Sequence, residues 1–141
     1  MQQAYRRLAF TYAKAMDHDG AAQLPAIMTN DIVIEGPGFK MDGLAQAQHS
    51  PVNLKEMYAK TRHVVSNQTC ELTGADTAIG ETYCIAHHVY ADWKGQGPTD
   101  YSWHIRYQDR LVKENGHWKF QHRELVLDWT SLTPVKMEPQ H

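Results

Sequence analysis

The stretch that decides the fold, residues 100–129, reads DYSWHIRYQDRLVKENGHWKFQHRELVLDW. Apolar and polar residues alternate through much of it, as they do when side chains point in turn to the two faces of a β-strand. Asn115-Gly116 interrupts the pattern with the dipeptide that most strongly favours a two-residue hairpin turn. The stretch therefore predicts two long antiparallel strands, over 100–113 and 117–129.

Two further strand-like runs precede this pair, over residues 62–72 and 78–91. Turn-forming Gly, Pro, Asn and Asp residues separate the runs, in particular at 74–76 and 94–98. Long consecutive strands joined by short turns predict an antiparallel meander.

The first part of the chain has helical periodicity instead. Residues 2–16 place apolar side chains at helical spacing opposite Arg and Lys, and shorter helices are expected over 21–28, 42–48 and 54–60, with a strand over 32–35. Helices first and strands afterwards is an α+β pattern. We therefore expect a cone-shaped, strongly curved antiparallel (mixed) sheet, with the N-terminal helices packed on its concave face, enclosing a pocket.

Composition limits the possible functions. With 14 Lys and Arg against 16 Asp and Glu, and no long block of one sign, the chain has no electrostatic footprint for nucleic acid or an anionic membrane. No apolar run approaches the ~20 residues that cross a bilayer, and the N-terminus does not resemble a secretory signal. We expect a cytoplasmic protein with neither nucleic-acid nor membrane partners.

Cofactor and metal motifs are not visible in the sequence. Cys70 and Cys84 lack metal-ligand spacing, and there is no glycine-rich phosphate loop, HExxH or CxxC. We therefore expect no metal and no cofactor, so that any chemistry is done by side chains alone.

The strand faces indicate what could line a pocket. One face of 100–113 carries Tyr101, Trp103, Ile105, Tyr107 and Leu111, and it is the candidate pocket wall. The adjacent pair His87-His88 must be divided between two faces, so only one of these histidines can reach a ligand. A wall rich in Trp, Tyr, Ile and Phe suits a small hydrophobic or aromatic ligand.

Four segments together resemble a known family: YAKAMD at 12–17, TRHVVSN at 61–67, DRLVKENGHWKF at 109–120 and LDW at 127–129. They resemble the SnoaL-like branch of the nuclear-transport-factor-2-like superfamily and, within it, the scytalone dehydratase and hexachlorocyclohexane dehydrochlorinase families. The resemblance implies a single SnoaL-like domain over residues 1–134, followed by a C-terminal tail at 135–141.

The resemblance also implies site residues. The family's catalytic Asp falls on Asp17 and its catalytic His on His63, while a second pocket His falls on His87 and a pocket Phe on Phe39. The substrate-binding set expected from the faces and the resemblance together is Phe39, Tyr83, Ile85, Trp103, Ile105, Tyr107 and Phe120.

The chain also departs from the patterns of these families, and the pocket Asn of scytalone dehydratase falls on Tyr107. The two tyrosines that hold the catalytic water in scytalone dehydratase fall on Met16 and Gly36. The pocket Arg of the dehydrochlorinase falls on Phe120.

An Asp–His pair has a chemical logic of its own. A carboxylate that accepts the imidazole N–H fixes the tautomer and raises the basicity of the other nitrogen. His63 would then be a general base, Asp17 would stabilise its imidazolium, and His87 could protonate a leaving group. The alternative is that Asp17 merely ends a helix and His63 is a satisfied core histidine.

Three functions from different classes remain open. The first is a cofactor-independent lyase of the dehydratase or dehydrohalogenase type, acting on an apolar, aromatic or cyclic substrate. The second is an isomerase or polyketide-cyclase-like enzyme that uses the same Asp17–His63 pair, which is called the dyad below. The third is a non-catalytic ligand-binding or association module, because fold alone does not give function. The resemblance further implies a homodimer or homotrimer that forms through the sheet.

Overall fold

The computed structural model of the chain describes residues 1–139. The elements, in chain order, are α1 (Gln2–Asp17), the 3-10 helix η1 (Ala21–Ala26), β1 (Met28–Gly36), β2 (Phe39–Asp42), α2 (Leu44–Ala47), α3 (Ser50–Met57), β3 (Lys60–Leu72), β4 (Thr77–Tyr90), β5 (Thr99–Glu114) and β6 (His117–Pro134). The strands form one six-stranded sheet in the order β2-β1-β6-β5-β4-β3.

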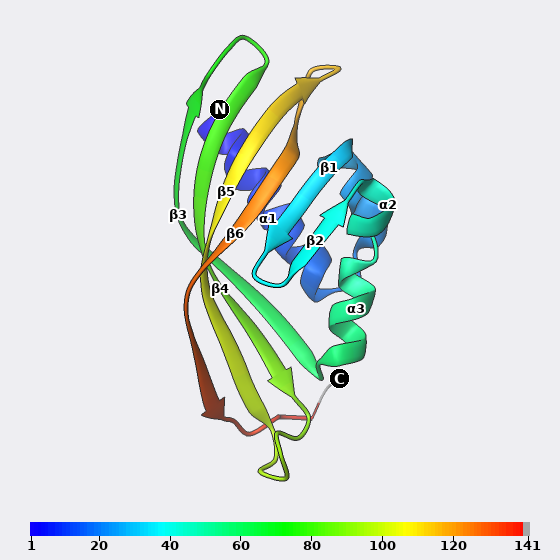
Figure 1. Cartoon of the computed structure of the whole chain (residues 1–141), viewed down its shortest axis with the longest axis vertical. Helices are drawn as coiled ribbons and strands as arrows, with labels where there is room; N and C mark the ends of the chain where they lie inside the picture. Colours follow the sequence, from blue (N-terminus) through cyan, green and yellow to red (C-terminus); the bar gives the residue numbers. More distant parts are fainter. Residues whose placement is uncertain (140–141) are drawn as a thin grey trace.

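The sheet is mixed and strongly twisted (Figure 1). β3, β4, β5 and β6 form the predicted antiparallel meander, and β1 pairs with β6 in parallel and with β2 antiparallel. Helix α1 lies against one face of the sheet, which we call the inward face, and the opposite face is the outer face. The predicted α+β class and its curved, mixed sheet are confirmed.

Some elements differ from the prediction. The helix expected over 21–28 is a 3-10 helix that contains Pro25, whose ring removes a backbone donor. β1 begins earlier than expected, and the four residues of β2 follow Gly38, which adopts a φ of 80°. Residues 140–141 of the expected tail lie outside the described residues.

The core lies between α1 and the meander. One face of α1 buries Tyr5, Leu8, Tyr12, Ala15 and Met16, while Arg6, Arg7 and Lys14 on its other side are exposed. These side chains belong to one cluster with the buried Ile105, Tyr107, Leu111 and Phe120 of the sheet. Burying each large apolar side chain stabilises the fold by roughly 1.5–3 kcal/mol. The packing brings the C-terminal end of α1 beside the start of β3.

Among residues 1–139, no helix is both long enough and apolar enough to cross a membrane.

The turn between β5 and β6 has the predicted geometry. Glu114 pairs with His117, and the two residues between them have positive φ angles, 51° at Asn115 and 81° at Gly116. Positive φ at both central positions is the hairpin geometry that Asn-Gly favours.

Replacing Gly116 with alanine tests this turn. No atom lies within 4 Å of where the new Cβ would be, so any loss comes from the backbone alone. We expect Gly116→Ala to lower the free energy of unfolding by about 1–2 kcal/mol in chemical denaturation. Asn115→Gly suits the same turn and should cost less; an equal loss in both variants would contradict this explanation.

Candidate functional site

Asp17 and His63 form a hydrogen-bonded pair where α1 meets β3. The His63 Nδ1–H donates to Asp17 Oδ1 at 2.7 Å, and the His63 backbone N–H donates to Asp17 Oδ2 at 2.8 Å. Thr61 Oγ1 donates to Asp17 Oδ1 at 3.0 Å. The carboxylate therefore accepts three hydrogen bonds from one strand, and the pairing predicted from the sequence is present in the structure.

These bonds keep the Asp17 carboxylate charged in an unfavourable place. Asp17 is the last residue of α1, where the helix dipole disfavours a negative charge. Burial alone would raise the pKa of Asp17, but the hydrogen bonds from His63 and Thr61 outweigh it and leave the pKa below its ordinary value. An ionised Asp17 holds the His63 proton on Nδ1, which leaves Nε2 as the basic nitrogen.

A second histidine, His88, lies beside this pair on the inward face. His63 pairs with Ala86 and Thr61 with His88, and paired residues share a face of the sheet. The rings of His63 and His88 are 6.2 Å apart between centroids. The His88 Nδ1–H donates to the Tyr101 carbonyl at 3.0 Å. Burial lowers the pKa of His88, so this imidazole is neutral and its Nε2 is a hydrogen-bond acceptor.

Aromatic side chains surround His88. The centroid of Tyr58 is 4.8 Å away, that of Trp103 5.7 Å and that of Tyr101 6.4 Å. Burial and the neighbouring Tyr90 raise the pKa of Tyr58 to about 12, so its hydroxyl stays protonated. The Trp103 Nε1–H is buried and has no hydrogen-bond partner. Since an unsatisfied buried donor is costly, this N–H is a candidate contact for a ligand oxygen.

Two surface hollows reach the dyad. One, of about 530 Å³, lies between the end of α1, α3 and the start of β3, and includes Asp17, Leu54, Tyr58 and Thr61 in its lining. The other, of about 320 Å³, follows the seam of α1 and β3 and is lined by both Asp17 and His63. Asp17 therefore borders open space on two sides. A further hollow of about 590 Å³ contains neither dyad residue.

Placing His87, Tyr83 and Ile85 on the pocket side was wrong. Val64 pairs with Ile85 and Arg62 with His87, so these side chains lie on the outer face, opposite His63. The His87 Nδ1–H donates to Asp100 Oδ2 at 2.6 Å, and Ser102 Oγ donates to the same oxygen at 2.9 Å. Alternation divides the residues of a strand between two faces, but the pairing register decides which face is inward.

The other predicted residues occupy two different places. Trp103 lies in the aromatic group around His88, whereas Ile105, Tyr107 and Phe120 are buried in the hydrophobic core. Phe39 packs against the edge of that core from β2, where its ring lies so close to Gly36 that a Cβ there would be 2.7 Å away. The dyad and Trp103 are thus the predicted residues that lie around His88.

His88, Thr61 and Tyr58 are the site residues that the sequence prediction missed. The sequence signal for His88 was its adjacency to His87, since one of two adjacent strand residues must face inward. No group of three or more His, Cys, Asp or Glu side chains within residues 1–139 is arranged to hold a metal ion.

Comparison with known proteins identifies the family. The model of the SnoaL-like domain matches residues 2–124, so the chain belongs to the SnoaL-like domain family. No curated protein matches the chain in sequence.

Solved structures agree with this assignment. A candidate scytalone dehydratase from Novosphingobium aromaticivorans has a TM-score of 0.81 at 24% identity, covering 96% of this chain and 89% of that one. A hexachlorocyclohexane dehydrochlorinase, LinA type 2, has a TM-score of 0.85 at 19% identity, with 98% and 93% covered. A Nostoc punctiforme protein with a cystatin-like fold has a TM-score of 0.73 at 19% identity, with 90% of each chain covered. At these identities the similarities establish the fold rather than the reaction.

The buried, neutral state of His88 predicts a pH dependence of stability. Because its pKa is lower in the folded than in the unfolded protein, the unfolded state takes up the proton first as the pH falls below ~6.5. Stability should therefore decrease from pH 7 to 5. His88→Gln keeps a donor for the Tyr101 carbonyl but cannot titrate, so we expect a shallower slope of unfolding free energy against pH.

His49→Gln is the matched control, because His49 is an exposed residue. It should retain the wild-type slope in denaturant titrations at each pH. A slope that is unchanged in His88→Gln would show that His88 is not the residue responsible.

Proposed function

We propose that the protein is a cofactor-independent lyase of the dehydratase or dehydrohalogenase type, in which His63 is the general base. The observation that carries the proposal is the Asp17–His63 pair, whose geometry leaves Nε2 of His63 as the free, basic nitrogen. The aromatic group around His88 supports an apolar, aromatic or cyclic substrate, since such rings favour planar apolar molecules.

The reaction would begin with transfer of a proton from a substrate carbon to His63 Nε2. The electron pair of the broken C–H bond forms a carbon–carbon double bond, and a halide or hydroxide leaves from the neighbouring carbon. Asp17 stabilises the imidazolium that forms. When the leaving group is hydroxide, the imidazolium can return its proton to the departing oxygen, so that water is released and His63 is neutral again.

His88 and Trp103 would orient the substrate. A neutral His88 whose Nδ1–H is bound to the Tyr101 carbonyl can accept a hydrogen bond from a substrate hydroxyl, but it has no proton to donate from Nε2. The unpartnered Trp103 Nε1–H can donate to a substrate oxygen on which negative charge develops. The acid role considered for His87 does not fit its position on the outer face.

The same base also allows the other enzymatic hypothesis. An isomerase or cyclase-like enzyme would remove the same proton without expelling a leaving group. Product mass distinguishes the reactions, because elimination removes water or acid from the substrate and isomerisation does not.

Activity measurements on two probe classes test the proposal. Hexachlorocyclohexane reports elimination by chloride release, and β-hydroxy ketones report it by the ultraviolet absorbance of the enone product. We expect His63→Ala and Asp17→Asn each to lower kcat/KM by at least ~10²-fold, the usual contribution of a general base. His87→Ala, on the outer face, is the matched control and should retain wild-type activity.

Three results would count against the proposal. Full activity in His63→Ala would remove His63 as the base. An equal loss in His87→Ala and His63→Ala would show that the loss does not come from the inward face. Binding of the probes without turnover would favour the non-catalytic module.

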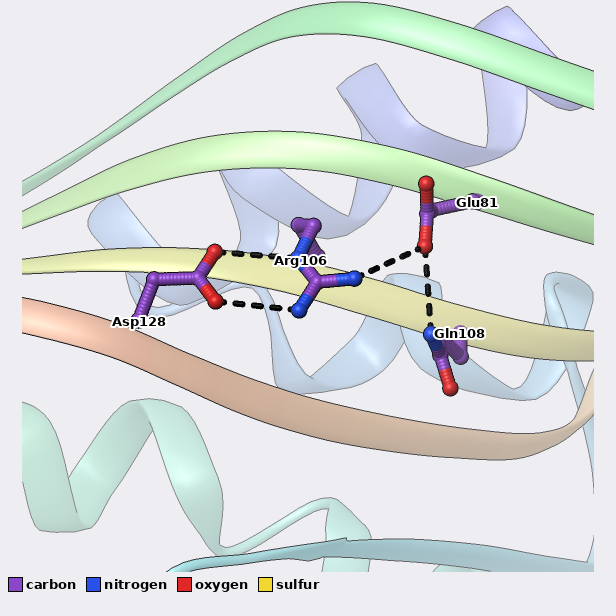
Figure 2. A network of polar contacts seen from close by, with 4 residues as sticks. All are labelled: Glu81, Arg106, Gln108 and Asp128. Atoms are coloured by element: carbon purple, nitrogen blue, oxygen red, sulfur yellow. Dashed lines mark hydrogen bonds and ion pairs between the residues drawn. The ribbon is translucent and has the colours of Figure 1, made fainter.

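We further propose that two copies associate through the outer face. Val64, Ile85, His104 and Trp129 form a continuous cross-strand row there, from β3 to β6. The rings of His104 and Trp129 stack at 4.5 Å, and Trp129 is 61% exposed. Beside this row, charged and polar groups are hydrogen-bonded to one another, as Figure 2 shows for Glu81, Arg106, Gln108 and Asp128. Such an exposed row, next to polar groups that are already hydrogen-bonded to one another, suits a second copy of the same surface.

Light scattering after size exclusion tests the association. We expect an oligomer for the wild-type chain and a smaller species for Trp129→Glu. Leu72→Glu is the control, because Leu72 is 58% exposed but lies outside the row. A wild-type monomer, or an oligomer that Trp129→Glu leaves intact, would contradict the proposal.

A further inference from the structure

A buried charged cluster joins α1 to the sheet far from the dyad along the helix. Tyr5, in the first turns of α1, donates its hydroxyl hydrogen to Asp109 Oδ2 at 2.5 Å. Arg123 donates to both oxygens of Asp109, from Nε at 2.7 Å and from Nη2 at 3.1 Å. The side chains of Arg123 and Asp109 are 1% and 0% exposed. These three residues are called the α1 clamp below.

Aromatic rings enclose the charged end of the clamp. The Arg123 guanidinium carbon lies 3.7 Å from the centroid of the Tyr107 ring, 4.1 Å from that of Phe120 and 4.4 Å from that of Tyr12. Burial opposes the charge on Arg123, but the adjacent Asp109 raises its pKa, so the guanidinium stays charged. Burial also raises the pKa of Tyr5, which keeps its hydroxyl protonated and able to donate.

The clamp contacts α1 near its N-terminal end, and the dyad contacts it at its C-terminal end. Tyr5 bonds to Asp109, Tyr12 stacks on Arg123, and Asp17 bonds to His63. At ~1.5 Å per residue, Tyr5 and Asp17 are about 18 Å apart along the helix axis. The apolar contacts of α1 are non-directional and allow it to slide or rotate, whereas hydrogen bonds at one end fix both its axial position and its rotation.

The sheet also provides a recess for the clamp. A Cβ on Gly80 of β4 would come within 2.5 Å of Tyr5 Cζ, so the Tyr5 ring lies directly on the glycine backbone. A larger residue at this position would lift the start of α1 away from the sheet.

Stability alone does not account for such a cluster. A buried ion pair often contributes no more than well-packed apolar residues of the same volume, because removing both charges from water is costly. A cluster of this kind does, however, define a single geometry.

We infer that Tyr5, Asp109 and Arg123 are positioning residues, which set the register of α1 so that Asp17 reaches His63. This inference rests on the observed dyad and not on the reaction, so it can be tested without a substrate. It predicts that a change in the first turns of α1 alters the hydrogen bonds between Asp17 and His63, at the other end of the helix.

NMR of Tyr5→Phe tests the inference. The variant keeps the ring on Gly80 and removes the hydroxyl donor. One readout is hydrogen exchange of the His63 backbone N–H, which is bonded to Asp17 Oδ2, and the other is the resonance of the His63 Nδ1–H. We expect His63 amide protection, measured relative to the central amides of β4, to fall at least about tenfold and the ring-proton resonance to broaden.

Two further variants make the result decisive. Gly80→Ala displaces Tyr5 without changing the chemistry of the clamp, and should produce the same effects at His63. Ile34→Val removes a methyl group from a buried residue of β1 and controls for general loss of stability. It should leave both His63 signals unchanged.

The inference is overturned when Tyr5→Phe and Gly80→Ala melt at lower temperature but keep the wild-type exchange and ring-proton signals of His63. It is also overturned when Ile34→Val changes the His63 signals as much as Tyr5→Phe and Gly80→Ala change them. Failure of the lyase proposal would appear in the activity assays and would leave these NMR signals unaffected.

Discussion

The hydrogen bond between Asp17 and His63 is the contact on which the rest of the site depends. It joins the last residue of the first helix to the edge strand β3, two elements that are far apart in the sequence. The bond needs α1 to lie at a defined height on the sheet, a strand register that turns His63 inward, and a carboxylate that remains charged at an unfavourable helix end. Hydrogen bonds from Thr61 and from the His63 backbone N–H help to keep the Asp17 carboxylate charged, because each donates to it.

The chain contains a second His–Asp pair, and the comparison shows what distinguishes a candidate base. His87 and Asp100 are 2.6 Å apart, as close as the dyad, but the His87 side chain is 33% exposed and lies on the outer face. The His63 side chain is 7% exposed and lies near a neutral histidine and aromatic rings. Where water is excluded, interactions between charged and polar groups are stronger. Burial and neighbours, rather than the pair alone, therefore single out His63 rather than His87 as the candidate base.

The sequence was sufficient for the elements with long, continuous patterns. The periodicity of α1 and the alternation of four strands identified the fold, and the family resemblance pointed to Asp17 and His63. β2 was missed because four residues are too short to show a period. The inward position of His88 depends on the pairing of β4 with β3, which is a long-range contact. Arg123 was missed for a similar reason: an irregularity in the pairing of β6 with β5, between Arg110 and Leu111, lets both Phe120 and Arg123 point inward although they are three residues apart.

The tautomer of His63 shows most directly whether Asp17 orients this ring, and it can be read from the ring ¹⁵N shifts of the wild-type protein at neutral pH. We expect a single tautomer, with the proton on Nδ1 and an unprotonated Nε2, and we expect this preference to be lost in Asp17→Asn. A proton on Nε2, or a ring that exchanges freely between both tautomers, would contradict this expectation. In that case Asp17 would not orient His63, and the site would have no general base of the kind proposed.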